Sequence, residues 1–175
     1  MKPQVLFVHN QAPRNPIMKK RFAVLLMAAA AALLWTQGVK AMDLDRYRWQ
    51  HRLLLLFAPQ EDTPGYAAAA EDIQRHSEGI LDRDLVVFHV LEDGASRVDG
   101  RRLSDAEARQ LRDRFEIDPG RFTAVLIGKD GGVKLVRRDS VDLQAVFDRI
   151  DAMPMRQREM REKQSSTRPA GKSRS

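Results

Sequence analysis

The hydrophobic pattern in the first half of the chain predicts two buried strands joined by a helix. Residues 53–57, Leu-Leu-Leu-Leu-Phe, form an apolar run that suits a strand covered on both faces, and Pro59 ends it. Residues 85–91 are a second such run, rich in β-branched and aromatic side chains. Between them, apolar or small residues recur at helical spacing over 66–81, and Gly79 is expected to end this helix. A crossover of this length predicts that the two strands are parallel.

The second half of the chain predicts two further helices and two further strands. Ser104 and Glu107 have the spacing of a capping box, which opens a helix. Residues 128–132 are glycine-rich and typical of a hairpin between antiparallel strands. The predicted elements are a loop at 92–103, a helix from Ser104, strands at 122–127 and 133–138, and a helix that is capped by Ser140 and interrupted at Met153-Pro154-Met155.

The order β-α-β followed by α-β-β-α is that of the thioredoxin fold. It predicts an α/β, thioredoxin-like three-layer sandwich, in which a βαβ unit is followed by an αββα unit around a central mixed four-stranded sheet. We expect this domain to occupy residues 42–161. An Arg-rich continuation of the last helix leads into a basic tail at 162–175, which its composition predicts to be disordered.

The connection after the first strand resembles the active-site loop of the peroxiredoxins. Residues 57–66 read Phe-Ala-Pro-Gln-Glu-Asp-Thr-Pro-Gly-Tyr, and in that family a strand ending in an aromatic residue and proline is followed by Thr-x-x-Cys. Thr63 and Pro64 match this pattern, whereas Tyr66 stands where the peroxidatic cysteine would be. The chain contains no cysteine, which excludes thiol peroxidase and disulfide oxidoreductase chemistry.

Several other segments resemble the family named domain of unknown function 4174. They are Trp49-x-x-Arg52 with the leucine run after it, Asp82-Arg-Asp-Leu-Val-Val, Leu126-Ile-Gly-Lys-Asp-Gly-Gly-Val-Lys134, and Ile150-Asp-Ala-Met-Pro-Met-Arg156. The resemblance covers nearly all of the expected domain. It implies a thioredoxin-like fold and an exported bacterial protein, with similar domains in animal extracellular matrix proteins, and it carries over no established activity.

Residues 1–41 predict a secretory signal peptide. The basic stretch Lys19-Lys20-Arg21 precedes an uncharged apolar run that is too short to span a bilayer comfortably, and small residues follow it. Cleavage is expected between Ala41 and Met42. Met18 is the expected true start, because the residues before it add nothing that a signal peptide needs. The protein is therefore expected to be exported, to the periplasm if its source is a Gram-negative bacterium and otherwise out of the cell.

The formal net charge of +6 belongs to the two ends of the chain. Residues 1–41 hold six basic side chains and no acidic one, which leaves 24 basic and 24 acidic side chains in the mature chain. A mature chain near neutrality is not expected to bind nucleic acid. The basic C-terminal tail is expected to make at most weak contact with anionic surfaces, and a solvated helix is the equally weighted alternative.

The candidate ligand-binding residues gather around the loop after the first strand. They are Gln60, Glu61, Asp62, Thr63, Tyr66 and Arg121. Glu61 and Asp62 form an acidic pair that either works as acid and base or holds a cation, or simply complements the dipole of the following helix. Tyr66 is either a binding group or a core residue. Arg121 is expected to approach the same end of the sheet.

No catalytic residue, metal site or cofactor is predicted. Asp72 and His76 have a spacing that could share a metal ion, but two ligands do not make a site. His89 lies within a predicted strand and is expected to be a satisfied core histidine.

The favoured function is a non-catalytic binding or interaction module, with a protein or a small ligand as its partner. The alternative is an enzyme of non-thiol chemistry that uses Glu61, Asp62 and Tyr66. Convergence of these side chains on one pocket would favour the alternative.

Overall fold

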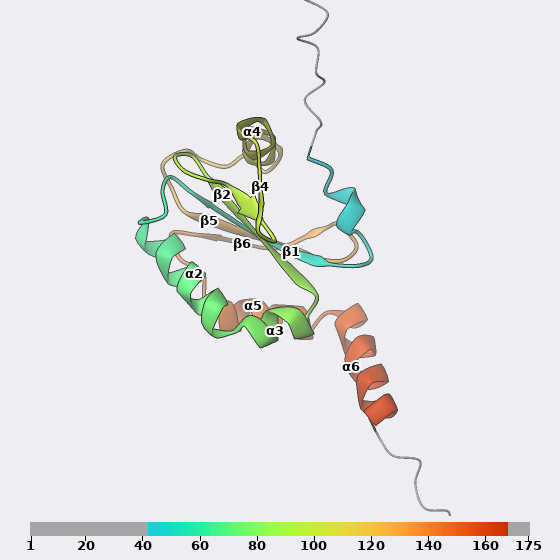
Figure 1. The fold of residues 1–175 in the computed structure, drawn as a ribbon. Coiled ribbons are helices and arrows are strands. Elements are labelled where there is room, and N and C mark those ends of the chain that lie inside the picture. Colours follow the sequence, from blue (N-terminus) through green and yellow to red (C-terminus); the bar gives the residue numbers. More distant parts are fainter. Residues whose placement is uncertain (1–41, 168–175) are drawn as a thin grey trace, which may run out of the picture. The chain divides into compact units, whose positions relative to one another are not determined.

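The computed structural model describes residues 42–167, and the predicted signal peptide and the last residues of the tail lie outside this part. A mixed sheet forms its centre (Figure 1), in the strand order β4-β3-β2-β1-β5-β6. β1 (Arg52–Ala58) lies in the middle and runs parallel to β2 (Leu85–Leu91). On its other side β1 pairs antiparallel with β5 (Thr123–Ile127), which forms the predicted hairpin with β6 (Val133–Arg138).

The sheet has six strands where the sequence predicts four. The two additional strands are β3 (Arg97–Val98) and β4 (Arg101–Arg102), inside the segment expected to be a loop. Asp99 and Gly100 connect them, both with positive φ, and Asp-Gly is the turn that two-residue hairpins prefer. This dipeptide was the sequence signal for the missed hairpin.

Helices cover both faces of the sheet, which gives the predicted three layers (Figure 1). α2 (Pro64–Arg75), α3 (Ser77–Asp82) and α5 (Leu143–Asp151) lie on one face. α4 (Asp105–Arg114) lies on the other face, and it begins with the predicted capping box. The short 3-10 helix η1 (Asp45–Tyr47) contributes Tyr47 to the core on the α4 side. This arrangement is the thioredoxin-like fold.

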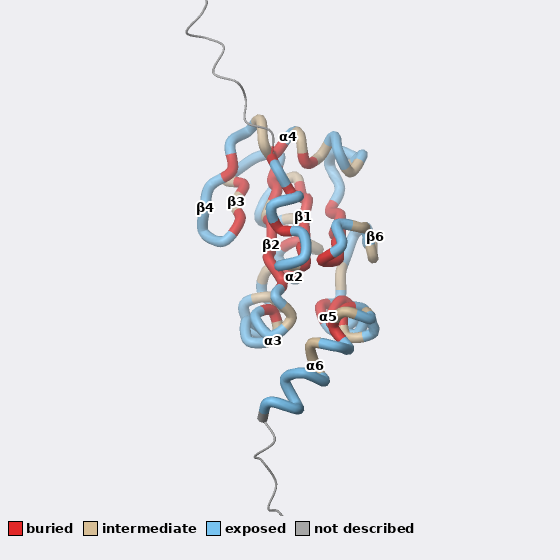
Figure 2. Tube along the Cα trace, turned by 90° about the vertical axis from the view of Figure 1, so that its right-hand side faces the viewer, coloured by how far each residue is buried: buried red, intermediate tan, exposed pale blue. Residues whose placement is uncertain are grey.

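Alternate residues of β1 supply two separate cores. Leu54 and Leu56 pack with the α2 and α5 side chains, whereas Leu53 and Leu55 pack with the α4 and η1 side chains. All seven residues of β1 are buried, and Figure 2 shows burial concentrated in the central strands. The continuous apolar run is thus explained by a central strand covered on both sides.

The predicted helix over 66–81 is divided into α2 and α3 at His76. Gly79, expected to end the helix, lies inside α3. A Cβ atom at Gly79 would stand 2.8 Å from a ring carbon of Phe147 in α5, so glycine permits close packing of the two helices. This contact joins segments far apart in the sequence, which local periodicity does not register.

The C-terminal helices differ from expectation at two points. Asp142, not Ser140, caps α5, because its side chain accepts a hydrogen bond from the backbone N–H of Gln144. α6 (Pro154–Thr167) follows the predicted interruption and continues beyond residue 161, where the domain was expected to end. It is mostly exposed (Figure 2). Among residues 42–167, no helix combines the length and the apolar character needed to cross a membrane.

Candidate functional site

The predicted site lies at the carboxyl end of β1, where the chain turns into α2. Thr63 occupies the N-cap position of α2 and Pro64 the first helical position, as expected. The Thr63 hydroxyl does not cap the helix. It accepts a hydrogen bond of 3.3 Å from the backbone N–H of Gln60 and so closes the turn that precedes the helix.

Tyr66 is buried in the first turn of α2 and belongs to a polar network. Its hydroxyl lies 2.8 Å from Nδ1 of His89 in β2, and Nη2 of Arg97 in β3 donates to it over 3.4 Å. The rings of Tyr66 and His89 meet edge to face, with centroids 5.7 Å apart. Because Arg97 can only donate, the phenolic O–H is free to donate to Nδ1 of a neutral histidine that carries its proton on Nε2.

Burial determines the charge states in this network. Burial raises the pKa of Tyr66, and the opposing effect of Arg97 does not cancel it. Burial lowers the pKa of His89 to about 4, and the positive charge of Arg97 acts in the same direction. At neutral pH the network therefore holds an uncharged phenol and an uncharged imidazole. Neither group is activated as a nucleophile or as a cationic acid.

The other residues of the loop are exposed. Glu61 forms an ion pair of 2.9 Å with Arg97, and 61% of its side chain is accessible to solvent. Gln60 donates to the carboxylate of Asp93 over 3.4 Å. Asp62 has no hydrogen bond or ion pair with any residue in the described part of the chain. The acidic pair is thus split between one bound and one unengaged carboxylate.

Arg121 lies at the same end of the sheet, because Phe57 of β1 stands opposite Thr123 of β5. It forms an exposed ion pair of 2.8 Å with Asp139. The start of α2 touches this corner so closely that a Cβ on Gly65 would lie 2.1 Å from the Asp139 carbonyl oxygen. At this end of the sheet, the start of α2 therefore packs directly against the backbone of the segment after β6.

The six predicted residues lie outside the three cavities described next. Cavities of about 360, 260 and 10 Å³ open on residues 42–167, and none of the six lines any of the three. Glu61 and Tyr66 are linked only through Arg97, which the sequence pattern placed in a loop. His89 and Arg97 stand opposite each other in the β2–β3 ladder, so both could have been found once the Asp99-Gly100 hairpin was recognised.

A second polar cluster lies at the opposite end of β1, and we call it the ionic cluster. Arg52, which is 1% exposed, donates to the carboxylate of Glu159 over 3.1 and 3.2 Å and to the carbonyl oxygen of Arg83 over 2.9 Å. Lys129 lies 2.8 Å from both Glu159 and Asp84. One carboxylate on α6 thus joins the start of β1 to the β5–β6 hairpin.

Arg156 extends the ionic cluster to α3 and α5. Its buried guanidinium donates to the carboxylates of Asp82 and Asp151. These hydrogen bonds raise the pKa of Arg156 against the opposing effect of burial. The pKa of Asp82 is lowered, first by the hydrogen bond from Lys163 and, against the effect of burial, also by Arg156. The cluster fixes the first half of α6 to the domain through charge instead of apolar contact.

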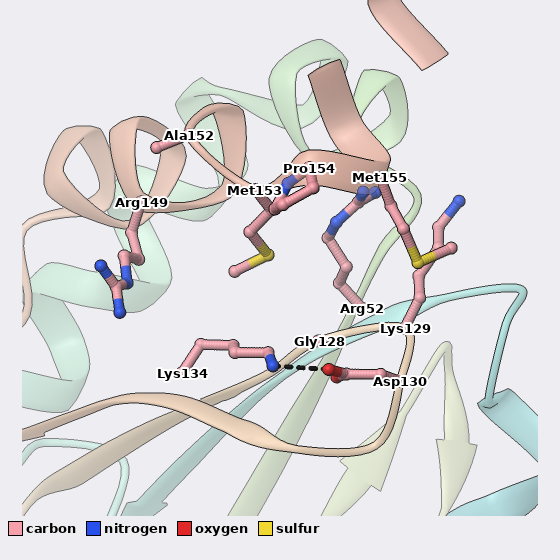
Figure 3. Close-up of a pocket in the computed structure, with 10 residues that line it drawn as sticks. All are labelled: Arg52, Gly128, Lys129, Asp130, Lys134, Arg149, Ala152, Met153, Pro154 and Met155. Atoms are coloured by element: carbon pink, nitrogen blue, oxygen red, sulfur yellow. Dashed lines mark hydrogen bonds and ion pairs between the residues drawn. The ribbon is translucent and has the colours of Figure 1, made fainter. Parts of the chain in front are cut away.

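The cavity of about 360 Å³ opens beside the ionic cluster (Figure 3). Basic side chains of the sheet and of α5 line it, and the α5–α6 connection supplies an apolar wall. Its lining residues are Arg52, Gly128, Lys129, Asp130, Lys134, Arg149, Ala152, Met153, Pro154 and Met155. The described residues include no group of three or more metal-ligating side chains.

The family named Domain of unknown function (DUF4174) matches residues 43–159. The chain belongs to this family. The segments through which it resembles DUF4174 meet in the ionic cluster, since they contribute Arg52, Asp82, Lys129 and Arg156. These segments therefore meet at the end of the sheet opposite to Tyr66.

Among individual proteins, this chain is similar to one much longer protein and to two solved structures of low sequence identity. Coiled-coil domain-containing protein 80 of Danio rerio is 29% identical over 138 residues, which cover 70% of this chain and 16% of that protein. Among solved structures, peroxiredoxin Q of Xanthomonas campestris is 18% identical with a TM-score of 0.47, covering 62% of this chain and 83% of that one. The reduced 2-Cys peroxiredoxin of Plasmodium vivax is 16% identical with a TM-score of 0.49, covering 67% of this chain and 84% of that one.

Proposed function

We propose that this DUF4174 protein is an exported thioredoxin-like module that binds a partner and catalyses no reaction at the loop after β1. The observation that carries the proposal is the environment of Tyr66. The residue is 2% exposed, its hydroxyl is held by His89 and Arg97, and burial raises its pKa. A neutral, buried phenol with both hydrogen-bonding roles occupied is a structural group and a poor nucleophile.

The exposed residues around Tyr66 form the contact surface in this proposal. Gln60, Glu61, Asp62 and Arg121 lie on the surface at one end of the sheet, and they offer both signs of charge. Such a surface suits a polar protein partner or small ligand. The alternative of a non-thiol enzyme is less well supported, because these side chains line none of the three cavities.

An activity assay tests the non-catalytic part of the proposal. The purified mature protein is incubated with hydrogen peroxide and a thiol reductant, and separately with insulin and the same reductant. We expect no turnover above the rate without protein, because the chain has no cysteine. Turnover that is retained in metal-free buffer and lost on Tyr66→Phe or Glu61→Gln would overturn the proposal.

The export part rests on residues 1–41 and calls for a separate test. A fusion of this segment to alkaline phosphatase, which is active only outside the cytoplasm, is expressed in a Gram-negative host. We expect periplasmic activity from the fusion and from a version that starts at Met18. A matched fusion in which Lys19, Lys20 and Arg21 are replaced by glutamate should lose it. No periplasmic activity from either the full-length fusion or the fusion that starts at Met18 would contradict export.

The basic end of the chain is a further contact in this proposal. Arg158 and Arg161 are exposed on α6, and the tail beyond it is also basic. Weak attraction to anionic surfaces follows from this charge. Deletion of residues 164–175 should reduce co-sedimentation with vesicles of anionic lipid at low salt, and the difference should vanish at high salt.

A further inference from the structure

The cavity beside the ionic cluster has the chemistry of an anion site. Four cations line it, namely Arg52, Lys129, Lys134 and Arg149, against the single carboxylate of Asp130. Lys134 is paired with Asp130 over 2.6 Å, and Arg52 and Lys129 are paired with carboxylates of the ionic cluster. Arg149 forms no ion pair with any residue of 42–167. Pairing therefore leaves one uncompensated positive charge at the cavity.

A buried donor at the cavity has no acceptor. Arg52 is 1% exposed, and its Nε–H makes no hydrogen bond with the described residues although both terminal nitrogens do. An unsatisfied donor on a buried charged group is costly. The Nε–H is closed to solvent, so Arg52 contributes positive charge beneath the cavity and not a contact with a ligand. Figure 3 shows Arg52 rising from the sheet between Met153 and Met155 on the cavity wall.

The start of α6 adds to the attraction for an anion. Pro154 and Met155 belong to the first turn of this helix and line the cavity. The first backbone N–H groups of a helix have no partner within the helix, and its dipole places partial positive charge there. The unpaired Arg149 is independent of this effect and points to the same ligand charge.

The wall opposite the sheet is apolar. Ala152, Met153, Pro154 and Met155 form it, and Figure 3 shows Arg149 beside Ala152 on α5 and Lys134 on the sheet below. The hydrogen bond between Lys134 and Asp130 crosses above Gly128, where a Cβ would lie 2.6 Å from the Lys134 side chain. Because Gly128 has no side chain, the Lys134–Asp130 pair can lie directly against its backbone. The volume of about 360 Å³ falls within the range of small-molecule sites.

We propose that this cavity binds a small organic acid that has one carboxylate and a short apolar group. One uncompensated cation fits a single negative charge, and the carboxylate would pair with Arg149. The apolar group would pack on Met153 and Met155. The cavity lies at the opposite end of β1 from the contact surface proposed above, so the proposal adds a second binding site to that module.

The test is calorimetric titration of the purified mature protein with octanoate, octanamide and acetate. We expect octanoate to bind and the other two ligands to bind much more weakly, because octanamide lacks the charge and acetate lacks the apolar group. Arg149→Gln should weaken octanoate binding about tenfold, as loss of a charge-assisted hydrogen bond implies. Arg149→Lys should recover part of the loss.

Arg102→Gln is the matched control. It removes the same charge from an exposed arginine of β4, which lies at the other edge of the sheet and does not line the cavity. It should leave octanoate binding unchanged. An equal loss in both variants would show diffuse electrostatic attraction and overturn the proposal, as would equal binding of octanoate and octanamide or no binding of octanoate. The activity assay is independent, so turnover would reject the module and leave the titration result standing.

Discussion

At the scale of single residues, Tyr66 shows how one side chain can be fixed in the core by polar contacts. It lies at the start of α2, where it is buried and hydrogen-bonded to two other side chains. Its hydroxyl satisfies a histidine of β2 and an arginine of β3 at once. The residue thus joins three elements that are separate in the sequence.

Tyr66→Phe should destabilise the domain by about 1–3 kcal/mol, because it leaves Nδ1 of His89 without a donor in a partly buried position. Urea denaturation followed by circular dichroism measures the change. Tyr47→Phe is the matched control, since its hydroxyl is bound only by the neighbouring Arg46. We expect a smaller loss there. Equal stability of Tyr66→Phe and the unmodified protein would show that the network is not stabilising.

His89 should make the stability of the domain depend on pH. Its pKa is about 4 in the folded state and 6.5 for an unperturbed histidine, so the unfolded chain binds more protons between these values. The free energy of unfolding therefore falls as pH decreases from 6.5 towards 4. The contribution is at most about 3 kcal/mol, and it is smaller for a ring that retains some contact with water.

His89→Asn tests this dependence, because asparagine keeps a polar group near the position of Nδ1 but does not titrate. Urea midpoints of both proteins are compared at pH 7 and pH 5. We expect the unmodified protein to lose more stability between these pH values than the variant does. Parallel losses would assign the pH dependence to other groups.

At the scale of elements, local pattern succeeded where each element is determined by its own residues. The apolar runs predicted β1 and β2, and Ser104 with Glu107 predicted the start of α4. Local pattern failed to predict features that depend on contacts between residues far apart in the sequence. Gly79 approaches Phe147 of α5 closely, and the ionic cluster joins residues up to 107 positions apart. No local period encodes such pairs.

The candidate site also has one part that the sequence predicts and another that it does not. Tyr66 could be singled out from the loop motif, because the motif is continuous in the sequence. Its partners His89 and Arg97 come from the β2–β3 ladder, and the cavity is assembled from β1, the β5–β6 hairpin and the α5–α6 connection. A site built across the sheet is visible only after the strand order is known.

α6 depends on Glu159 for its attachment. Glu159→Gln removes the negative charge that faces Arg52 and Lys129. Lys129 then keeps the carboxylate of Asp84, whereas buried Arg52 is left with no carboxylate partner among the described residues. We expect a loss of about 2 kcal/mol, below the usual cost of breaking a buried pair because Glu159 is 22% exposed. Hydrogen exchange should also show faster opening of α6.

The matched control for this helix is Glu162→Gln. Its side chain is exposed and forms no ion pair with the described residues. It should change stability by no more than about 0.5 kcal/mol. A similar loss in both variants would mean that the net charge of α6, and not the contact with Arg52, holds the helix in place.

At the scale of the whole molecule, the two cores depend on one strand. Leu54 faces the core with α2 and α5, and Leu55 faces the core with α4, yet both belong to β1 and are at most 1% exposed. Loss of β1 would remove the central support of both layers. The described domain should therefore unfold as one cooperative unit, although its helices are divided between two faces.

Leu54→Ala and Leu55→Ala test whether the domain unfolds as one cooperative unit, because the two side chains lie on opposite faces of the sheet. Each should cost about 2–5 kcal/mol, because each deletes a fully buried side chain and leaves a cavity. Urea unfolding is followed by far-ultraviolet circular dichroism, which reports the helices, and by the near-ultraviolet tyrosine bands, which report Tyr47 on one face and Tyr66 on the other. We expect one transition with coincident midpoints in both variants. If Leu55→Ala released the α4 side while α2 and α5 stayed folded, the two faces would be separate folding units, and β1 would not couple the Tyr66 network to the rest of the domain.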